Sequence, residues 1–212
     1  MICISTKECY KTVAAPGEAL LIEKKSKFIA TVRPVTCEQE ALEFLQTMRS
    51  EYSDATHNVY AYVIDENNIF RYSDDGEPGG TAGMPVLDTI RKEGIVDVAV
   101  VVTRYFGGTL LGTGGLVHAY GSSAKEGLYA ADIVTRTLCD EVHIKTDYGY
   151  SGKLIHEIES SGYIQEDTVY SDAVEFIILS KISETEKIVK DFTDMTNGTA
   201  EITVTGRKYV YL

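Results

Sequence analysis

Cysteine is scarce in this chain, and the few thiols form no recognisable motif. The four cysteines are Cys3, Cys9, Cys37 and Cys139, and no two of them make a C-x-x-C pair. Neither a disulfide framework nor a zinc site is therefore indicated. Long apolar runs are also missing, because no stretch approaches the roughly 18–20 apolar residues of a membrane span. Residues 1–13 lack the apolar core of a signal peptide, so the simplest expectation is a cytoplasmic protein without a membrane partner.

Basic residues are also few, and they are outnumbered by acidic residues. The 212 residues include 20 Lys and Arg against 32 Asp and Glu, which gives a formal net charge of −12. Acidic residues are in excess on both sides of Thr137, by five before it and by seven after it. A surface of this sign repels phosphate backbones, so no general affinity for nucleic acid is expected. A local basic patch could still override the overall charge.

The patterning of the first part, residues 1–137, indicates a mixed α/β domain. Thr36 is expected to act as the N-cap of the first helix, whose apolar positions share one face. The charged segment 23–26 is expected to join the first two strands. The expected strands are 19–23, 27–35, 58–64, 69–72 and 96–103, and the expected helices are 37–51, part of 81–93, and 114–131.

The second part, residues 138–212, has a different order of expected helices and strands. A short β-like stretch at 133–138 is the natural crossing point between the two domains. The expected elements are then strand 141–146, helix 151–161, strands 163–170 and 173–180, helix 184–196 and strand 200–211. The order β-α-β-β-α-β over about 75 residues suits a ferredoxin-like sandwich.

Two glycine-rich segments, at 72–85 and 103–121, are the most unusual feature of the composition. The second begins where the apolar run 98–102 stops. Glycine lets the backbone approach a partner closely and adopt positive φ, and glycines between a buried strand and a helix often build a site. Known phosphate motifs fit poorly, however. Val117 breaks a dinucleotide fingerprint, no Gly-Lys-Ser/Thr follows the glycines, and segment 121–124 carries helical apolar spacing, so we expect it inside a helix.

The acidic cluster in the first glycine-rich segment has two interpretations. Asp74, Asp75 and Glu77 could ligate magnesium or act as general acids and bases. Asp-Asp-Gly-Glu-Pro is equally strong turn chemistry. His57 precedes a strand and either pairs with a carboxylate or is an ordinary hydrogen-bonded residue. No catalytic set, metal site or cofactor can be nominated from these spacings.

Arg104 is more informative, because the apolar strand before it delivers a guanidinium to the end of the sheet. Tyr105 and Phe106 follow it directly. That combination suits recognition of a phosphate, a carboxylate or a planar base. The structural alternative is an internal ion pair with Asp74, Asp75 or Glu77, and the sequence leaves both possibilities open.

These segments resemble the YigZ/IMPACT family, the bacterial relatives of the eukaryotic translation regulator IMPACT. The matching segments are KSKFIA (25–30), His57 with Ala61-Tyr62, SDDGEP (73–78), GTAG (80–83) with Pro85, RYFGG (104–108), LGTGGL (111–116) and Ala119-Tyr120. The resemblance implies an α+β protein of two domains. Residues 1–137 would have the left-handed βαβ fold of the second domain of a small-subunit ribosomal protein and of domain IV of elongation factor G. Residues 138–212 would be a ferredoxin-like domain similar to domain V of that factor.

The resemblance also frames the expected function. The eukaryotic relatives act by protein–protein contact on a pathway that controls translation initiation. They carry a different extra domain that is absent here, so that partner does not simply transfer. The bacterial members supply no settled activity or cofactor. The family often has a Cys or second His near the position of His57, whereas His57-Asn58-Val59-Tyr60 stands here, which weakens metal or thiol chemistry.

We therefore expect a non-enzymatic binding protein linked to translation regulation, in contact with the ribosome, RNA or a translation factor. One alternative is an enzyme or small-ligand binder that recognises a phosphate-bearing ligand, and another is that the glycine signature is a folding device. The candidate binding residues are Arg104, Tyr105, Phe106, Gly107, Gly108, Gly112, Gly114, Gly115, His57, Asp74, Asp75 and Glu77.

Overall fold

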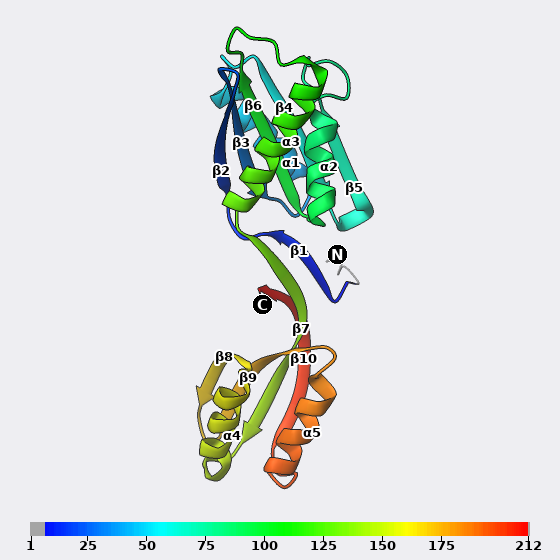
Figure 1. Cartoon of the computed structure of the whole chain (residues 1–212). Helices are drawn as coiled ribbons and strands as arrows, with labels where there is room; N and C mark the ends of the chain where they lie inside the picture. Colours follow the sequence, from blue (N-terminus) through cyan, green and yellow to red (C-terminus); the bar gives the residue numbers. More distant parts are fainter. Residues whose placement is uncertain (1–6, 212) are drawn as a thin grey trace. The chain divides into compact units, whose positions relative to one another are not determined.

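The computed structural model describes residues 7–211, which fall into two compact units. The first unit contains Tyr10–Thr135, and the second contains the chain from Arg136 onward together with Lys7–Cys9. Each unit has its own β-sheet with helices packed against it (Figure 1). Among these residues no helix is long and apolar enough to cross a membrane.

The first unit is built on a five-stranded antiparallel sheet. Its strands are ordered β2-β3-β6-β4-β5, so β6 lies at the centre. The strands are β2 (Gly17–Glu23), β3 (Ser26–Pro34), β4 (His57–Ile64), β5 (Ile69–Ser73) and β6 (Val98–Tyr105). The helices are α1 (Glu38–Glu51), α2 (Gly83–Glu93) and α3 (Gly112–Ala130), and a 3₁₀ turn, η1 (Glu66–Asn68), connects β4 to β5.

Helices on both faces of this sheet explain why the apolar run in β6 is unbroken. Val98, Val100 and Val102 pack into a core shared with α2 and α3. Ala99 and Val101 point to the other face and pack with α1. A strand buried on both sides reads as continuous apolar sequence rather than as alternation. Figure 1 shows α2 and α3 side by side across one face of the sheet.

The second unit has the split βαβ order that the sequence predicts. Its four principal strands are ordered β10-β7-β9-β8, and the neighbouring strands are antiparallel. Both helices share one apolar core with the sheet (Figure 1). The elements are β7 (Ile133–Thr146), α4 (Tyr148–Ser161), β8 (Ile164–Tyr170), β9 (Val174–Lys181), α5 (Thr185–Met195) and β10 (Glu201–Tyr211). This order is that of a ferredoxin-like sandwich.

The α+β class with two antiparallel sheets confirms the expected fold, but two local predictions need correction and one strand is not predicted. The segments 133–138 and 141–146 form one continuous strand, β7. A further strand, β1 (Cys9–Val13), pairs with β7, and the sequence pattern does not predict it. Thr36 is not the N-cap of α1, because Cys37 holds that position. The backbone N–H and the hydroxyl of Thr36 instead donate to Glu40 Oε2, at 2.6 and 3.1 Å.

Candidate functional site

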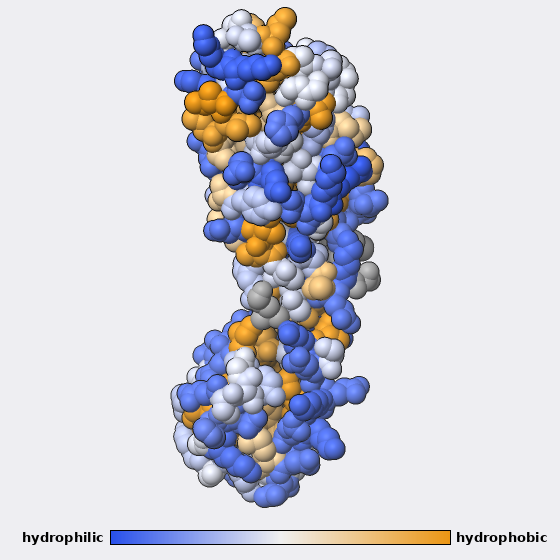
Figure 2. Space-filling model, viewed as in Figure 1, coloured by the Kyte–Doolittle hydropathy of each residue, from blue (hydrophilic) through white to orange (hydrophobic). Residues whose placement is uncertain are grey.

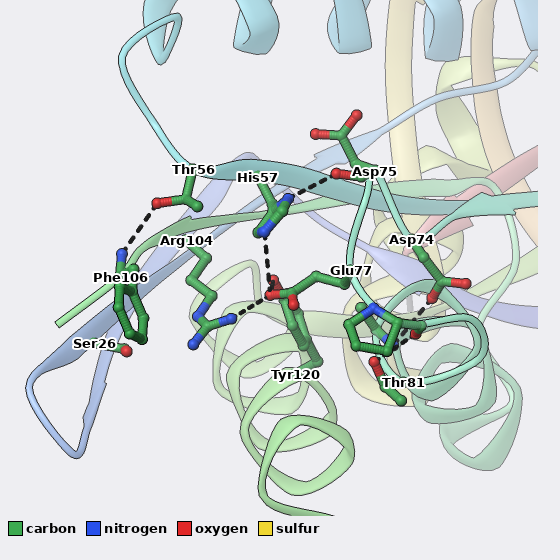
Figure 3. A network of polar contacts seen from close by, with 12 residues as sticks. Ser26, Thr56, His57, Asp74, Asp75, Glu77, Thr81, Arg104, Phe106 and Tyr120 are labelled. Atoms are coloured by element: carbon green, nitrogen blue, oxygen red, sulfur yellow. Dashed lines mark hydrogen bonds and ion pairs between the residues drawn. The ribbon is translucent and has the colours of Figure 1, made fainter. Parts of the chain in front are cut away.

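The guanidinium of Arg104 lies in a buried ion pair. Arg104 stands near the carboxyl end of β6 and is 5% exposed. Its Nη1 donates to Glu77 Oε1 at 2.5 Å, and Glu77 comes from the segment between β5 and α2 (Figure 3). Of the two interpretations of Arg104, the structure therefore shows the internal ion pair, with Glu77 as the partner. The guanidinium does not stand free in solvent.

The same carboxylate oxygen gathers groups from two further elements. The phenol of Tyr120, on α3, donates to Glu77 Oε1 at 2.8 Å. Burial, followed by the nearby Glu77 charge, raises the pKa of Tyr120 far above its ordinary value, so the phenol stays protonated and can donate. His57 Nε2, at the start of β4, lies 3.8 Å from the same oxygen. Glu77 thus links β4, β6 and α3 inside the first unit (Figure 3).

His57 has a defined proton position. Its Nδ1 lies 2.7 Å from the backbone carbonyl oxygen of Asp75. A carbonyl oxygen can only accept, so Nδ1 must carry the hydrogen, and a neutral His57 has its lone pair on Nε2. The Asp75 side chain is engaged as well, because its Oδ2 accepts from the backbone N–H of Asn58 at 2.6 Å. Asp75 therefore fixes the acidic turn to the start of β4.

Asp74 serves the start of α2. Its two carboxylate oxygens accept from the backbone N–H groups of Gly80, Ala82 and Gly83, at 2.8, 3.0 and 2.8 Å. The first N–H groups of a helix have no partner within the helix, so this carboxylate satisfies donors that would otherwise be unpaired. The structure thus brings Arg104, His57, Asp75 and Glu77 to one network and places Asp74 at its edge. Within residues 7–211 no group of three or more His, Cys, Asp or Glu is arranged to hold a metal ion.

Gly107 is required for a close approach between two loops. A Cβ atom at this position would lie 2.1 Å from the carbonyl carbon of Lys25 and 2.4 Å from the nitrogen of Ser26. The N–H of Gly107 also donates to the Ser26 hydroxyl at 3.1 Å. The β6–α3 loop consequently packs directly on the β2–β3 turn, where Lys24 and Lys25 both have positive φ.

The remaining glycines of the signature have different roles. Gly108 and Gly112 have φ of +82° and +76°, in the left-handed region that favours glycine. Gly112, Gly114 and Gly115 form the first turn of α3, and the first two are exposed. Segment 121–124 lies inside α3, as its apolar spacing predicts, so its amides belong to the helix.

Beside this buried network lies a group of residues that we call the tip surface. It consists of the exposed Lys24, Lys25, Lys27 and Phe106 and the half-buried Tyr105. A pocket of about 270 Å³ lies within it, lined by Lys25, Lys27, Ile29, Tyr105 and Phe106. Figure 2 shows hydrophilic and hydrophobic side chains side by side at the end of the first unit where the β2–β3 turn and the β6–α3 loop lie.

Phe106 connects the exposed surface to the buried network. The residue is 46% exposed, and the centroid of its ring lies 5.5 Å from Arg104 Cζ. The ring centroid of Phe28 lies 5.4 Å from the same Cζ atom. The backbone N–H of Phe106 donates to the Thr56 hydroxyl at 3.1 Å (Figure 3). Arg104 is therefore buried, and it borders this surface through the ring of Phe106.

Several residues of this region cannot be assigned a role from sequence patterns. The apolar spacing marks Tyr120 as a helix position that faces the core, but not as a donor to Glu77. The sequence places the lysines at 24, 25 and 27 in and beside a charged turn, but it does not show that they lie near Tyr105 and Phe106. Strand register supplies the missing information. Lys27 on β3 pairs with Tyr105 on β6, and His57 on β4 pairs with Arg104 on β6. No local pattern reports such pairings.

Comparison with family models agrees with the two-unit description. Residues 24–128 match the model of the Impact N-terminal domain. Residues 144–199 match the model described as a domain of unknown function, DUF1949. A solved structure titled "Crystal structure of an hypothetical protein" has a TM-score of 0.59 at 28% identity, over 94% of this chain and 98% of that one.

Similar proteins carry the same family name. The IMPACT family member YvyE of Bacillus subtilis is 43% identical over 194 residues, which cover 91% of this chain and 89% of that protein. The IMPACT family member YigZ of Escherichia coli is 37% identical, over 66% of this chain and 71% of that protein. The Protein IMPACT homolog of Dictyostelium discoideum is 43% identical over 101 residues, which cover 45% of this chain and 29% of that protein. The chain belongs to the IMPACT family.

Proposed function

We propose that this protein is a non-enzymatic binding protein that contacts the translation apparatus (the ribosome, RNA or a translation factor) through the tip surface. One observation carries the proposal. Three exposed lysines lie beside an exposed phenylalanine and a pocket, in a chain whose net charge is −12. A local basic and aromatic patch on an otherwise acidic protein favours one specific anionic partner over general attraction to polyanions.

The buried network supports a binding role for this surface and leaves little for catalysis. The Arg104 charge is neutralised by Glu77, and Asp74 and Asp75 are engaged by backbone N–H groups. The loop that carries Phe106 is held by separate contacts, from the Gly107 N–H to the Ser26 hydroxyl and from the Phe106 N–H to the Thr56 hydroxyl. Leu110, in the same β6–α3 loop, is 82% exposed. Contiguous exposed apolar surface rimmed by polar side chains marks interaction sites, and Leu110 adds to the apolar surface that Phe106 exposes in this loop.

The link to translation comes from the family. The resemblance implies domains similar to domains IV and V of elongation factor G, and relatives of this chain bear the name of a translation regulator. Fold-level likeness is an analogy and does not identify a partner. The partner must therefore be found with variants of the tip surface.

Co-sedimentation with ribosomes tests this proposal. The double variant Lys25→Ala/Lys27→Ala should pellet with ribosomes to a clearly smaller extent than the wild type, and the difference should shrink as salt rises. The matched control is Lys145→Ala/Lys187→Ala, which removes two exposed lysines from the second unit and should pellet like the wild type. Equal pelleting of all three proteins would contradict the proposal.

The pocket also favours a second candidate function, the binding of a small phosphate-bearing ligand. A volume of about 270 Å³ with two lysines in its lining has room for a compact anion. Thermal-shift screening of nucleotides and phosphorylated metabolites, with and without magnesium, tests this candidate. A compound that raises the melting temperature of the wild type but not of Lys25→Ala/Lys27→Ala would support it.

A further inference from the structure

We infer that the tip pocket takes a nucleobase of single-stranded RNA, with the flanking phosphates on Lys24, Lys25 and Lys27. This inference rests on the proposed function and names its partner. Proteins that bind single strands combine aromatic rings, on which bases stack, with basic groups that follow the backbone. The tip surface has both, and its parts come from the β2–β3 turn, β3, the end of β6 and the loop after it, which the fold brings together.

The pocket has the dimensions and lining of a site for one base. Lys27 pairs with Tyr105 across the sheet, and Ile29 follows Lys27 on the same face of β3. The lining is thus an aromatic and aliphatic wall with two ammonium groups, Lys25 and Lys27. Its volume of about 270 Å³ is below the range of roughly 300–1,000 Å³ typical of pockets for drug-sized ligands. A single planar ring system therefore fits better than an extended cofactor.

Phe106 is placed to act as the stacking platform. Nearly half of the residue is exposed, and the ring borders the pocket. The guanidinium of Arg104 supports the ring, and Glu77 fixes that guanidinium. The backbone of Phe106 is tied to Thr56. A ring that is already held in place loses little conformational freedom when a base stacks on it, which favours binding.

The lysines are held where phosphates of a bound strand would pass. Lys24 and Lys25 occupy the β2–β3 turn, and the contact between Gly107 and Lys25 fixes that turn against the β6–α3 loop. The neighbouring acid Asp54 accepts a hydrogen bond from the Tyr105 hydroxyl at 2.8 Å. Glu23 pairs with Ser26 at the turn, and neither carboxylate lines the pocket.

A protein partner would use this region differently. Leu20 and Ile22, on β2, are each 60% exposed and pair with Ile29 and Lys27, respectively, across the β2–β3 ladder. They extend an apolar strip away from the pocket along β2. A docked protein would cover these aliphatic side chains, whereas a base in the pocket with its phosphates on the lysines need not touch them. Substitution of this strip therefore distinguishes the two kinds of partner.

The experiment is fluorescence anisotropy with the full chain and a labelled 12-nucleotide oligouridylate. Phe106→Ala should weaken binding about 5- to 150-fold, the range typical when the aromatic partner of one stacked base is removed, whereas Phe106→Tyr should keep it. Lys25→Ala/Lys27→Ala should make the slope of log K against log salt shallower by about 1.4, or about 0.7 for each phosphate that is no longer neutralised. Leu20→Ser/Ile22→Ser should bind like the wild type, and an RNA duplex should bind more weakly than the single strand.

The outcomes separate this inference from the proposed function. Failure of the oligonucleotide to bind, while Lys25→Ala/Lys27→Ala still loses ribosomes, would overturn the RNA assignment and leave the proposed function standing. Loss of ribosomes by Leu20→Ser/Ile22→Ser in the same series would identify a protein partner. Uridine monophosphate that competes as well as the 12-mer would also overturn the assignment of a strand. Binding of the 12-mer with the expected variant pattern, but without ribosome association, would support the inference and identify RNA, rather than the ribosome, as the partner.

Discussion

At the scale of single residues, the carboxylate of Glu77 is the point on which the buried polar groups of the first unit converge. One of its oxygens accepts from Arg104 and Tyr120 and faces His57. Both members of the ion pair are almost completely removed from solvent, with side chains 6% and 4% exposed. A pair of this kind contributes less to stability than its Coulomb attraction indicates, but loss of one member leaves an uncompensated buried charge.

Arg104→Ala is therefore expected to destabilise the first unit strongly. Removal of one partner of a buried ion pair typically costs about 3–5 kcal/mol. Urea unfolding followed by far-UV circular dichroism measures the change. Arg71→Ala is the matched control, because Arg71 pairs with Glu38 at 3.8 Å and its side chain is 59% exposed. Exposed pairs contribute about 0–1 kcal/mol, so similar losses for both variants would contradict the interpretation of Arg104 as a buried structural cation.

Two adjacent glycines allow a sharp comparison at the same scale. Gly107→Ala places a Cβ atom inside the backbone of the β2–β3 turn, whereas Gly108→Ala meets nothing within 4 Å and is strained by its φ of +82°. A left-handed residue other than glycine costs roughly 1–2 kcal/mol. We expect Gly107→Ala to lose more free energy of unfolding than Gly108→Ala and also to weaken ribosome association, because it displaces Lys25.

Thermal unfolding and co-sedimentation of the two glycine variants give the measurement. If Gly107→Ala were as stable as Gly108→Ala and bound ribosomes normally, then the contact between the loop and the turn would not position the lysines. The tip surface would in that case depend on other contacts.

At the scale of secondary-structure elements, a charged cluster spans the sheet of the second unit. His143 on β7 lies between two carboxylates, with Nε2 3.0 Å from Glu141 Oε1 and Nδ1 2.8 Å from Glu175 Oε1. Lys208 on β10 pairs with Glu141 at 3.1 Å and also with Glu166 on β8. The cluster therefore joins all four principal strands. Hydrogen bonds to Glu141 and then to Glu175 raise the pKa of His143 above its ordinary value of 6.5.

This cluster predicts a pH dependence for the stability of the second unit. A raised histidine pKa contributes stability that is complete below about pH 6.5 and is lost as the pH rises through the folded-state value. Hydrogen bonds from His143, Lys208 and Thr205 lower the pKa of Glu141 from 4.5 to about 2, so its contribution is present above pH 4.5 and is lost as the pH falls toward 2. The contribution of the cluster should thus be largest between about pH 4.5 and 6.5.

Proton NMR titration of the histidine rings in the full chain measures this effect directly. The midpoint of His143 should lie above 6.5 and should fall in Glu141→Gln and further in the double variant Glu141→Gln/Glu175→Gln. In His143→Gln, the decrease in melting temperature between pH 6.5 and 8 should become smaller than in the wild type. A His143 midpoint at or below 6.5 would show that the carboxylates do not hold the proton.

Most elements could be predicted from the sequence because their apolar spacing follows the core they face. The run Val98–Val102 and the helix pattern through Leu116 and Leu128 are examples. The continuity of β7 could not be predicted, because Asp140 breaks its apolar pattern. That carboxylate is buried, and it accepts from Thr185 Oγ1 at 2.7 Å and from Arg207 Nε at 2.8 Å. These partners are 45 and 67 residues away along the chain, so no local sequence pattern predicts them.

The candidate site shows the same limit. The apolar strand before Arg104 places it at the end of β6, and the nearby acidic turn supplies its possible partners. The sequence does not distinguish Glu77 from Asp74 and Asp75, because that choice depends on how the turn folds back on β4 and α2. The role of the lysines depends on register as well. The position of a charged side chain at the end of a strand could thus be predicted, whereas its pairing with a residue from a distant segment could not.

At the scale of the whole molecule, each unit has enough buried apolar surface to form its own core. The first unit has one cluster on each face of its sheet, and the second has a single cluster around Phe176 and Phe192. The matches of separate family models to 24–128 and 144–199 agree with two folding units. We propose that the boundary lies close to Thr137, within β7. The charge asymmetry of the two parts is small, so net charge gives neither unit a preference for an anionic partner.

Two core variants test whether the units unfold separately. Phe176→Ala, in the core of the second unit, should cost that unit about 3–5 kcal/mol, the typical loss for a fully buried phenylalanine. Hydrogen exchange should then show faster exchange in β8 and β9, with β3 and β6 unchanged, and oligonucleotide binding at the tip surface should persist. Phe28→Ala, in the core of the first unit, should give the opposite pattern and weaken binding, because Phe28 packs on Arg104 and Tyr120. If either variant accelerated exchange equally in both sheets, the chain would unfold as one cooperative block, and the two-unit description would not extend to its energetics.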